Sequence, residues 1–167
     1  MKLLIATAIV ANLALAQNYT SPAAQTSVTI AGKKITITYH APQMHNRKIF
    51  GDLVPFGKVW RAGANEATAL HTDADLMIKN LNVPKGDYTL FVMPQPTGWQ
   101  LVVNKQTGQW GLEYHLDQDL GRVPMDMSQS PAPIDAFKIS LLTAAGNKGN
   151  LRMEWEKTIA IVPFTVK

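Results

Sequence analysis

None of the 167 residues of this chain is a cysteine. The chain therefore cannot form a disulfide, and it offers neither a thiol nucleophile nor a thiolate ligand for a metal. Lipid attachment at a signal-peptide cysteine is excluded for the same reason. An oxidising compartment is compatible with such a chain, although no disulfide would stabilise the fold there.

Familiar catalytic patterns and concentrated charge are also missing. The sequence has no HExxH, GxSxG, P-loop or dinucleotide-binding glycine pattern, so we expect no cofactor. The formal net charge is +4, and the basic residues occur singly or in pairs such as Lys33-Lys34. Because capture of a phosphate backbone requires clustered basic residues, we expect no nucleic-acid partner.

The one long apolar run lies at the beginning of the sequence. A charged start at Lys2 is followed by apolar residues over most of 3–15 and by the small-residue pattern Ala14-Leu15-Ala16. These three features in order predict a secretory signal peptide over residues 1–16. The alternative is a buried N-terminal helix or strand. The run is shorter than the ~20 apolar residues of a membrane span, so we expect no transmembrane segment after cleavage.

Residues 17–167 are expected to form a single domain, periplasmic or secreted, because ~150 residues can bury one hydrophobic core. Their short alternating apolar runs, separated by Gly, Pro and Asn, predict an all-β fold. About ten short strands indicate a β-sandwich or a closed sheet. We expect strands over residues 28–30, 35–39, 67–72, 76–78, 87–93, 99–104, 122–127, 137–143, 151–156 and 159–166.

Two predicted hairpins supply the expected core. Leu90 and Val92 should face Leu101 and Val103, whereas Ile139 and Leu141 should face Leu151, Met153 and Trp155. Trp99 and Trp155 are in phase with apolar neighbours, which favours the core over an exposed sugar-binding position. Tyr88 follows Leu81 and Pro84 at a strand entry, as in the tyrosine corner of immunoglobulin-like sandwiches. We therefore predict an antiparallel, immunoglobulin-like Greek-key sandwich.

The alternation stops between Tyr39 and Ala67, where the connection is too long for a plain hairpin. Long connections in compact domains are usually functional or disordered. This one carries Phe50, Phe56 and Trp60, a composition that argues against disorder. We expect one long ordered loop that packs against the sandwich.

The same connection carries a long motif, RKIFGDLVPFGKVWRAGANEAT, over residues 47–68. Together with VPKGDYTL at 83–90, WQLVVNK at 99–105 and QWG at 109–111, it resembles the bacterial family named domain of unknown function 2911. The resemblance implies an exported bacterial protein of unassigned activity. Asn46 and Lys85 stand where this family usually has Gly and Ala, and Asn also adopts a left-handed backbone.

The connection also holds the candidate binding residues. Arg offers a planar fork for a carboxylate or phosphate, Asn and Glu suit sugar hydroxyls, and Trp can stack on a ring. We expect a binding module for a small polar ligand, a glycan or an envelope partner, with a site formed by Arg47, Trp60, Arg61, Asn65, Glu66 and Trp110. The competing interpretation is that Arg61 pairs with Glu66 or Asp52 and only orders the loop.

Two other functions stay open at this stage. A hydrolase or isomerase would use Glu66 or Asp52 as a base beside Arg61, and a structural envelope protein would have no ligand site. A metal site would need convergence of His40, His45 and His71 with one of the same carboxylates, and we expect none. A binding site requires Arg61, Asn65, Glu66 and an aromatic ring to line one open pocket.

Overall fold

The computed structural model describes residues 20–167, so the predicted signal peptide over 1–16 lies outside the described residues. The described chain forms β1 (Ala23–Ile30), β2 (Lys33–His40), β3 (Thr68–Thr72), β4 (Leu76–Ile78), β5 (Leu81–Val83), β6 (Gly86–Pro94), β7 (Trp99–Asn104), the short 3-10 helix η1 (Leu116–Gln118), β8 (Asp119–Thr143) and β9 (Lys148–Val166). An all-β fold is therefore confirmed. Within residues 20–167, no helix has the length and apolarity needed to cross a membrane.

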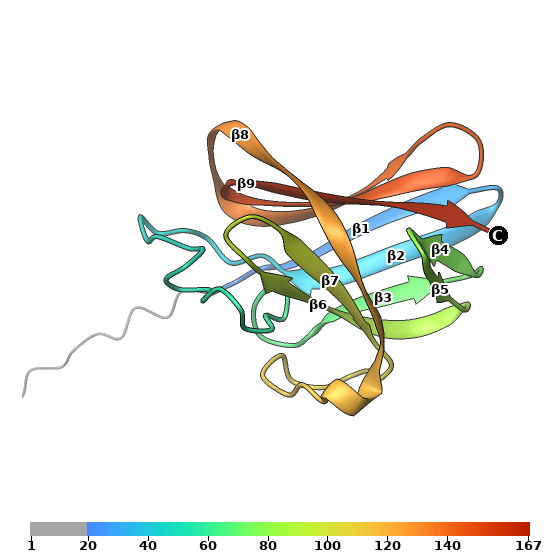
Figure 1. Cartoon of the computed structure of the whole chain (residues 1–167), viewed down its shortest axis with the longest axis horizontal. Coiled ribbons are helices and arrows are strands. Elements are labelled where there is room, and N and C mark those ends of the chain that lie inside the picture. Colours follow the sequence, from blue (N-terminus) through green and yellow to red (C-terminus); the bar gives the residue numbers. More distant parts are fainter. Residues whose placement is uncertain (1–19) are drawn as a thin grey trace, which may run out of the picture.

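All nine strands belong to one antiparallel sheet with the order β1-β2-β3-β6-β7-β8-β9-β4-β5. The sheet is not closed. Figure 1 shows how it folds over, with the β8–β9 hairpin lying along β1 and β2. One molecule-wide sheet thus supplies both walls of the core.

The expected division into two sheets is not found, because β8 is a single strand of 25 residues. It pairs with β7 up to Met125 and with β9 from Asp126 onward, so hydrogen bonding continues from one wall to the other. The register shifts between Gln129 and Ile134 and again between Ile134 and Lys138. Such shifts bend a strand without ending it. The predicted strands 122–127 and 137–143 are therefore both parts of β8, and 151–156 and 159–166 are both parts of β9.

The two flanks of the sheet meet through a few specific hydrogen bonds. Tyr39 Oη accepts from the Ile139 N–H at 3.0 Å, and Thr26 Oγ1 accepts from the Leu141 N–H at 3.1 Å. Just after β2, the Phe137 N–H donates to the Pro42 carbonyl at 2.8 Å. Side chains and a short backbone contact therefore hold β8 against the β1–β2 side.

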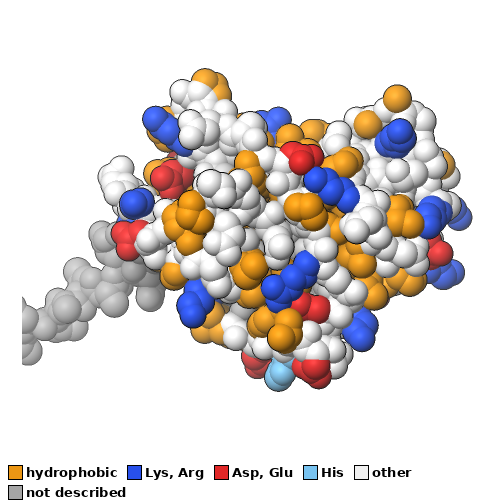
Figure 2. All heavy atoms as spheres, in the orientation of Figure 1, with side chains coloured by type: hydrophobic (Ala, Val, Ile, Leu, Met, Phe, Trp, Pro, Cys, Tyr) orange, Lys and Arg blue, Asp and Glu red, His pale blue; other side chains and the backbone are white. Residues whose placement is uncertain are grey.

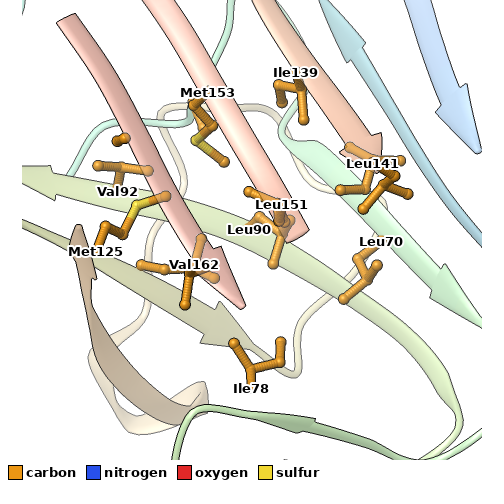
Figure 3. Packing of buried hydrophobic residues seen from close by; sticks show 14 of the residues in the cluster. Leu70, Ile78, Leu90, Val92, Met125, Ile139, Leu141, Leu151, Met153 and Val162 are labelled. Atoms are coloured by element: carbon orange, nitrogen blue, oxygen red, sulfur yellow. The ribbon is translucent and has the colours of Figure 1, made fainter. Parts of the chain in front are cut away.

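The predicted core is confirmed in both hairpins. Leu90 pairs with Val103 and Val92 with Leu101, while Ile139 pairs with Met153 and Leu141 with Leu151. All eight are buried, as are Trp99 and Trp155. Figure 3 shows side chains of β8 and β9 facing those of β3 and β6 across the core. Burial of each such side chain contributes roughly 1.5–3 kcal/mol before cavity effects.

Replacement of Leu90 tests this core. We expect Leu90→Ala to lower the free energy of unfolding by about 2–5 kcal/mol, because it removes buried methyl groups and leaves a cavity. Chemical denaturation measures the change. Leu116, which is 66% exposed on η1, is the matched control, and Leu116→Ala should change stability by less than about 0.5 kcal/mol. Equal effects at the two positions would contradict the assignment of the core.

Candidate functional site

The connection between β2 and β3, residues 41–67, is ordered by its own apolar side chains. Ile49, Phe50 and Val54 are buried in the core cluster. The Phe50 ring lies 4.6 Å from the Trp99 ring between centroids, and the Trp60 ring stacks on Trp155 at 5.8 Å with an interplanar angle of 18°. Their burial against the core explains why this connection is not a free loop.

A single carboxylate fastens the middle of the connection. Glu156 Oε2 accepts from the Ile49 N–H at 3.0 Å and from the Phe50 N–H at 3.2 Å. Glu156 itself has φ +56°, a backbone conformation that non-glycine residues adopt rarely. The neighbouring Trp155 side chain is buried and stacks on Trp60, so two consecutive residues of β9 hold the connection.

At the entry turn of the connection, the two residues before Arg47 have a left-handed backbone. His45 and Asn46 have φ +48° and +58°. Asn46 therefore adopts the left-handed backbone anticipated for the position that is usually Gly. The Arg47 guanidinium donates from Nε to the Met44 carbonyl at 2.9 Å and from Nη2 to the Gln43 carbonyl at 2.8 Å. Arg47 thus stabilises the turn while also lining the cavity described below.

The last part of the connection, residues 60–67, forms an exit turn in which backbone and side chains pack around Gly63. Its φ is +155°, and a Cβ added there would lie 2.8 Å from the His40 carbonyl oxygen. Only glycine allows the chain to approach β2 this closely. The Thr68 hydroxyl donates to the Ala62 carbonyl at 2.7 Å, and Trp60 Nε1 donates to the Gly63 carbonyl at 3.2 Å.

Arg61 projects from this turn without a partner. Its Nε is buried and has no hydrogen bond, and none of the described residues forms a hydrogen bond or ion pair with its guanidinium. Removal from water lowers the pKa of Arg61 from its ordinary value, although arginine stays protonated at any physiological pH. The expected alternative, in which Arg61 pairs with Glu66 or Asp52, is not observed.

Close packing fixes the stem of Arg61. A Cβ added at Gly111 would clash with the Arg61 side chain and would lie 2.5 Å from the Asn65 carbonyl oxygen. The Gly111 N–H donates to that same carbonyl at 3.0 Å. Glycine at position 111 therefore leaves the space that the arginine stem occupies.

A cavity of about 300 Å³ opens beside Arg61. It brings together four of the six expected binding residues, and none of the lining residues within 20–167 is an Asp or a Glu. Leu53 and Val54, which the sequence did not indicate as site residues, contribute to the wall, as does His45, which was considered above only as a metal ligand. The described residues that line it are Ser21, Pro42, Gln43, His45, Arg47, Leu53, Val54, Trp60, Arg61, Gly63, Ala64, Asn65 and Trp155.

The other two expected residues lie outside this cavity. Glu66 Oε2 lies 3.4 Å from His40 Nδ1, and both residues line a separate cavity of about 330 Å³ next to β1 and β2. Trp110 is 47% exposed. Its backbone forms an isolated antiparallel β-bridge with Glu66. The Trp110 loop is therefore attached to the exit turn, but Trp110 does not line the Arg61 cavity. Asp52 is exposed in the middle of the connection.

A polar network anchors the connection from β7 to β8, residues 105–118. Asn104 Nδ2 donates to Asp119 Oδ1 at 2.9 Å, and Tyr114 Oη donates to Asp119 Oδ2 at 2.7 Å. Arg122 donates to the same carboxylate at 3.1 Å and to Tyr114 Oη at 2.6 Å. Burial and the hydrogen bond to Asp119 raise the pKa of Tyr114. Tyr114 therefore keeps a neutral, fully engaged hydroxyl at the side of the site.

The histidines do not converge. Among residues 20–167, no group of three or more His, Cys, Asp or Glu side chains is arranged to hold a metal ion. His71 lies on the outer face, where Nδ1 is 2.7 Å from Asp87 Oδ1 and Nε2 is 3.1 Å from Asp73 Oδ1. Its two carboxylate partners occupy opposite ring nitrogens, an arrangement that leaves no shared centre for a cation.

The His71 cluster makes a prediction for pH dependence. Hydrogen bonds to Asp87 and Asp73 raise the pKa of His71 above 6.5. A raised folded-state pKa stabilises the fold below the unfolded value near 6.5, and this contribution is lost as the pH rises through the folded value. An NMR titration should place the His71 midpoint above 6.5, and Asp87→Asn should lower it, while Asp117→Asn should not. A wild-type midpoint at or below 6.5 contradicts this assignment.

The Glu156 contact is tested separately. We expect Glu156→Ala to lower the free energy of unfolding by about 1–3 kcal/mol, because two partly buried N–H groups lose their acceptor. Amide hydrogen exchange should accelerate at Ile49 and Phe50. Lys157→Ala, at the exposed neighbouring position, is the control and should leave both amides protected. Unchanged exchange in Glu156→Ala would show that the carboxylate does not hold the connection.

Comparison with known proteins gives a family but no characterised relative. A family model described as "Protein of unknown function (DUF2911)" matches residues 21–164, which include every motif quoted above. No curated protein and no solved structure matches the chain. Since the family model covers nearly all of the described residues, the chain belongs to the DUF2911 family of proteins of unknown function.

Proposed function

We propose that this domain binds a small anionic ligand through Arg61, in the cavity between the 41–67 connection and the sheet. The observation that carries the proposal is the buried Arg61 Nε without a hydrogen-bond partner, in a cavity whose lining includes no carboxylate. A positive charge withdrawn from water costs free energy unless an anion or hydrogen bonds compensate it. A bound carboxylate or phosphate supplies both.

The surrounding residues support an anion over a neutral ligand. The guanidinium can hold a carboxylate or phosphate with two parallel hydrogen bonds. Asn65 lines the same cavity and can donate a further hydrogen bond, and Arg47 adds a second positive charge to the wall. A negatively charged ligand would therefore complement the two arginines and the Asn65 amide of the cavity wall.

A neutral glycan fits this cavity less well. Sugar binding by stacking requires a free aromatic face, whereas Trp60 stacks on Trp155 and meets the Phe50 and Phe137 rings at 6.1 and 4.9 Å between centroids. Trp110 is exposed but lies outside the cavity. Of the ligand classes expected from the sequence, a small polar anion therefore has the strongest support.

The hydrolase or isomerase alternative requires a carboxylate beside Arg61. Neither Glu66 nor Asp52 lines the Arg61 cavity, so no observation favours that alternative. A purely structural role would leave the buried Arg61 Nε without a hydrogen-bond partner, and an unsatisfied buried donor costs free energy. The predicted signal peptide supports action in the periplasm or outside the cell.

Two features support kinship with immunoglobulin-like sandwiches as a further part of the proposal. The Tyr88 hydroxyl donates to the Pro84 carbonyl, four residues upstream, at 2.8 Å, as expected for a tyrosine corner. The folded-over sheet also encloses its core between two walls (Figure 1). The continuous β8 is the main departure from that architecture.

Thermal shift with matched ligand pairs tests the proposal. Succinate, glucuronate and glucose 6-phosphate should raise the melting temperature in a concentration-dependent way, because ligands that bind only the folded state stabilise it. Succinamide and glucose should not. Arg61→Gln should remove the shift, and Arg61→Lys should retain part of it, since Lys keeps the charge but lacks the fork.

The control variant is Lys33→Gln, which removes an exposed positive charge at the β1–β2 turn. It should leave the thermal shift unchanged. Equal shifts with charged and neutral ligands, or a full shift in Arg61→Gln, would overturn the proposal.

A further inference from the structure

A second hollow also borders Arg61. Its volume is about 230 Å³, and it shares Leu53, Val54, Trp60 and Arg61 with the first cavity. The remaining lining residues come from the connection itself, from β6 and from the 105–118 connection: Pro55, Lys58, Val59, Phe91, Gly111, Leu112 and Tyr114. Arg61 therefore borders two adjoining spaces.

The chemistry of the second hollow differs from that of the first. Its wall is mainly aliphatic and aromatic, and among the described lining residues the formal charges are those of Lys58 and Arg61, both positive. Phe91 and Tyr114 meet edge to face at 5.0 Å between ring centroids. Because Asp119 and Arg122 both hydrogen-bond the Tyr114 hydroxyl, this aromatic wall is held in place.

Large apolar side chains are left in water at the rim. Leu112 is 74% exposed and Leu53 is 46% exposed. Single exposed apolar residues need no explanation, but these two line the same hollow beside an uncompensated cation. Figure 2 shows apolar side chains interspersed with separate Lys and Arg side chains on one face of the molecule. An apolar wall with only positive charge at its edge complements a ligand that is apolar and anionic.

We propose that the ligand is an amphipathic anion, whose acidic group binds Arg61 in the first cavity and whose aromatic or aliphatic group occupies the second hollow. This assignment rests on the proposed anion-binding function and adds the class of ligand. A ligand held by the Arg61 guanidinium lies next to the second hollow, so one molecule can use both spaces. Binding pockets for small molecules usually combine such an apolar wall with a few polar groups that fix orientation.

Three related probes separate the acidic and apolar contributions. Acetate has only the acidic group, phenylacetate has both groups, and phenylacetamide is the neutral counterpart of phenylacetate. NMR titration of backbone amides measures even weak dissociation constants. Phenylacetate should bind about tenfold more tightly than acetate, since it buries additional apolar area, and phenylacetamide should bind more weakly than phenylacetate by a similar factor.

Two leucines on the same connection provide a matched pair of variants. Leu112→Ser should weaken phenylacetate binding several-fold without changing acetate binding. Leu116→Ser alters a residue of similar exposure outside the lining of the hollow, and it should affect neither ligand. Because both leucines are exposed, both variants should keep the wild-type fold and melting temperature.

Each outcome separates this inference from the proposed function. If acetate and phenylacetate bind equally, or if Leu112→Ser and Leu116→Ser behave alike, the amphipathic assignment is wrong while anion binding stands. If no anion binds and Arg61→Gln has no effect on any titration, the proposed function fails and the assignment fails with it.

Discussion

Stacking of Trp60 on Trp155 is the contact on which the candidate site depends. It fixes the start of the exit turn against the buried face of β9, while the adjacent Glu156 holds the middle of the same connection through two backbone N–H groups. Arg61 follows Trp60 directly, so the position of its side chain is set by an indole that cannot shift without opening the core. The cavity wall is therefore anchored to the core at Trp60.

The length of β8, 25 residues, also helps to position the candidate site. Because one strand serves both walls of the core, the β8–β9 hairpin that carries Trp155 and Glu156 is joined by hydrogen bonds to β7 and, through it, to β6. Trp60 pairs with Val92 of β6 through two backbone hydrogen bonds of 2.7 and 2.8 Å. Trp60 is thus attached through its backbone to β6 and through its ring to β9, and both strands belong to the same continuous sheet.

Sequence pattern predicted what depends on local alternation. The paired core residues of β6–β7 and β8–β9 follow from it. The order of the 41–67 connection follows instead from its aromatic content, and the cluster of Arg47, Trp60, Arg61 and Asn65 from the polar and aromatic residues in that connection. The single continuous sheet could not be predicted from the sequence. The alternation is lost where β8 bends between Gln129 and Lys138, and again where Glu156 of β9 has a left-handed backbone. The second hollow was also missed, since Leu112 and Tyr114 reach Arg61 from a distant part of the chain.

The close packing of the Arg61 stem against Gly111 constrains both positions. A longer side chain at position 111 would clash with the Arg61 stem, and an apolar residue at position 61 would avoid the buried Nε that has no hydrogen-bond partner. Selection for stability alone would favour that apolar replacement. Under the proposed function, position 61 is therefore a point of conflict between folding and binding, because a more stable apolar replacement there would no longer hold the anion.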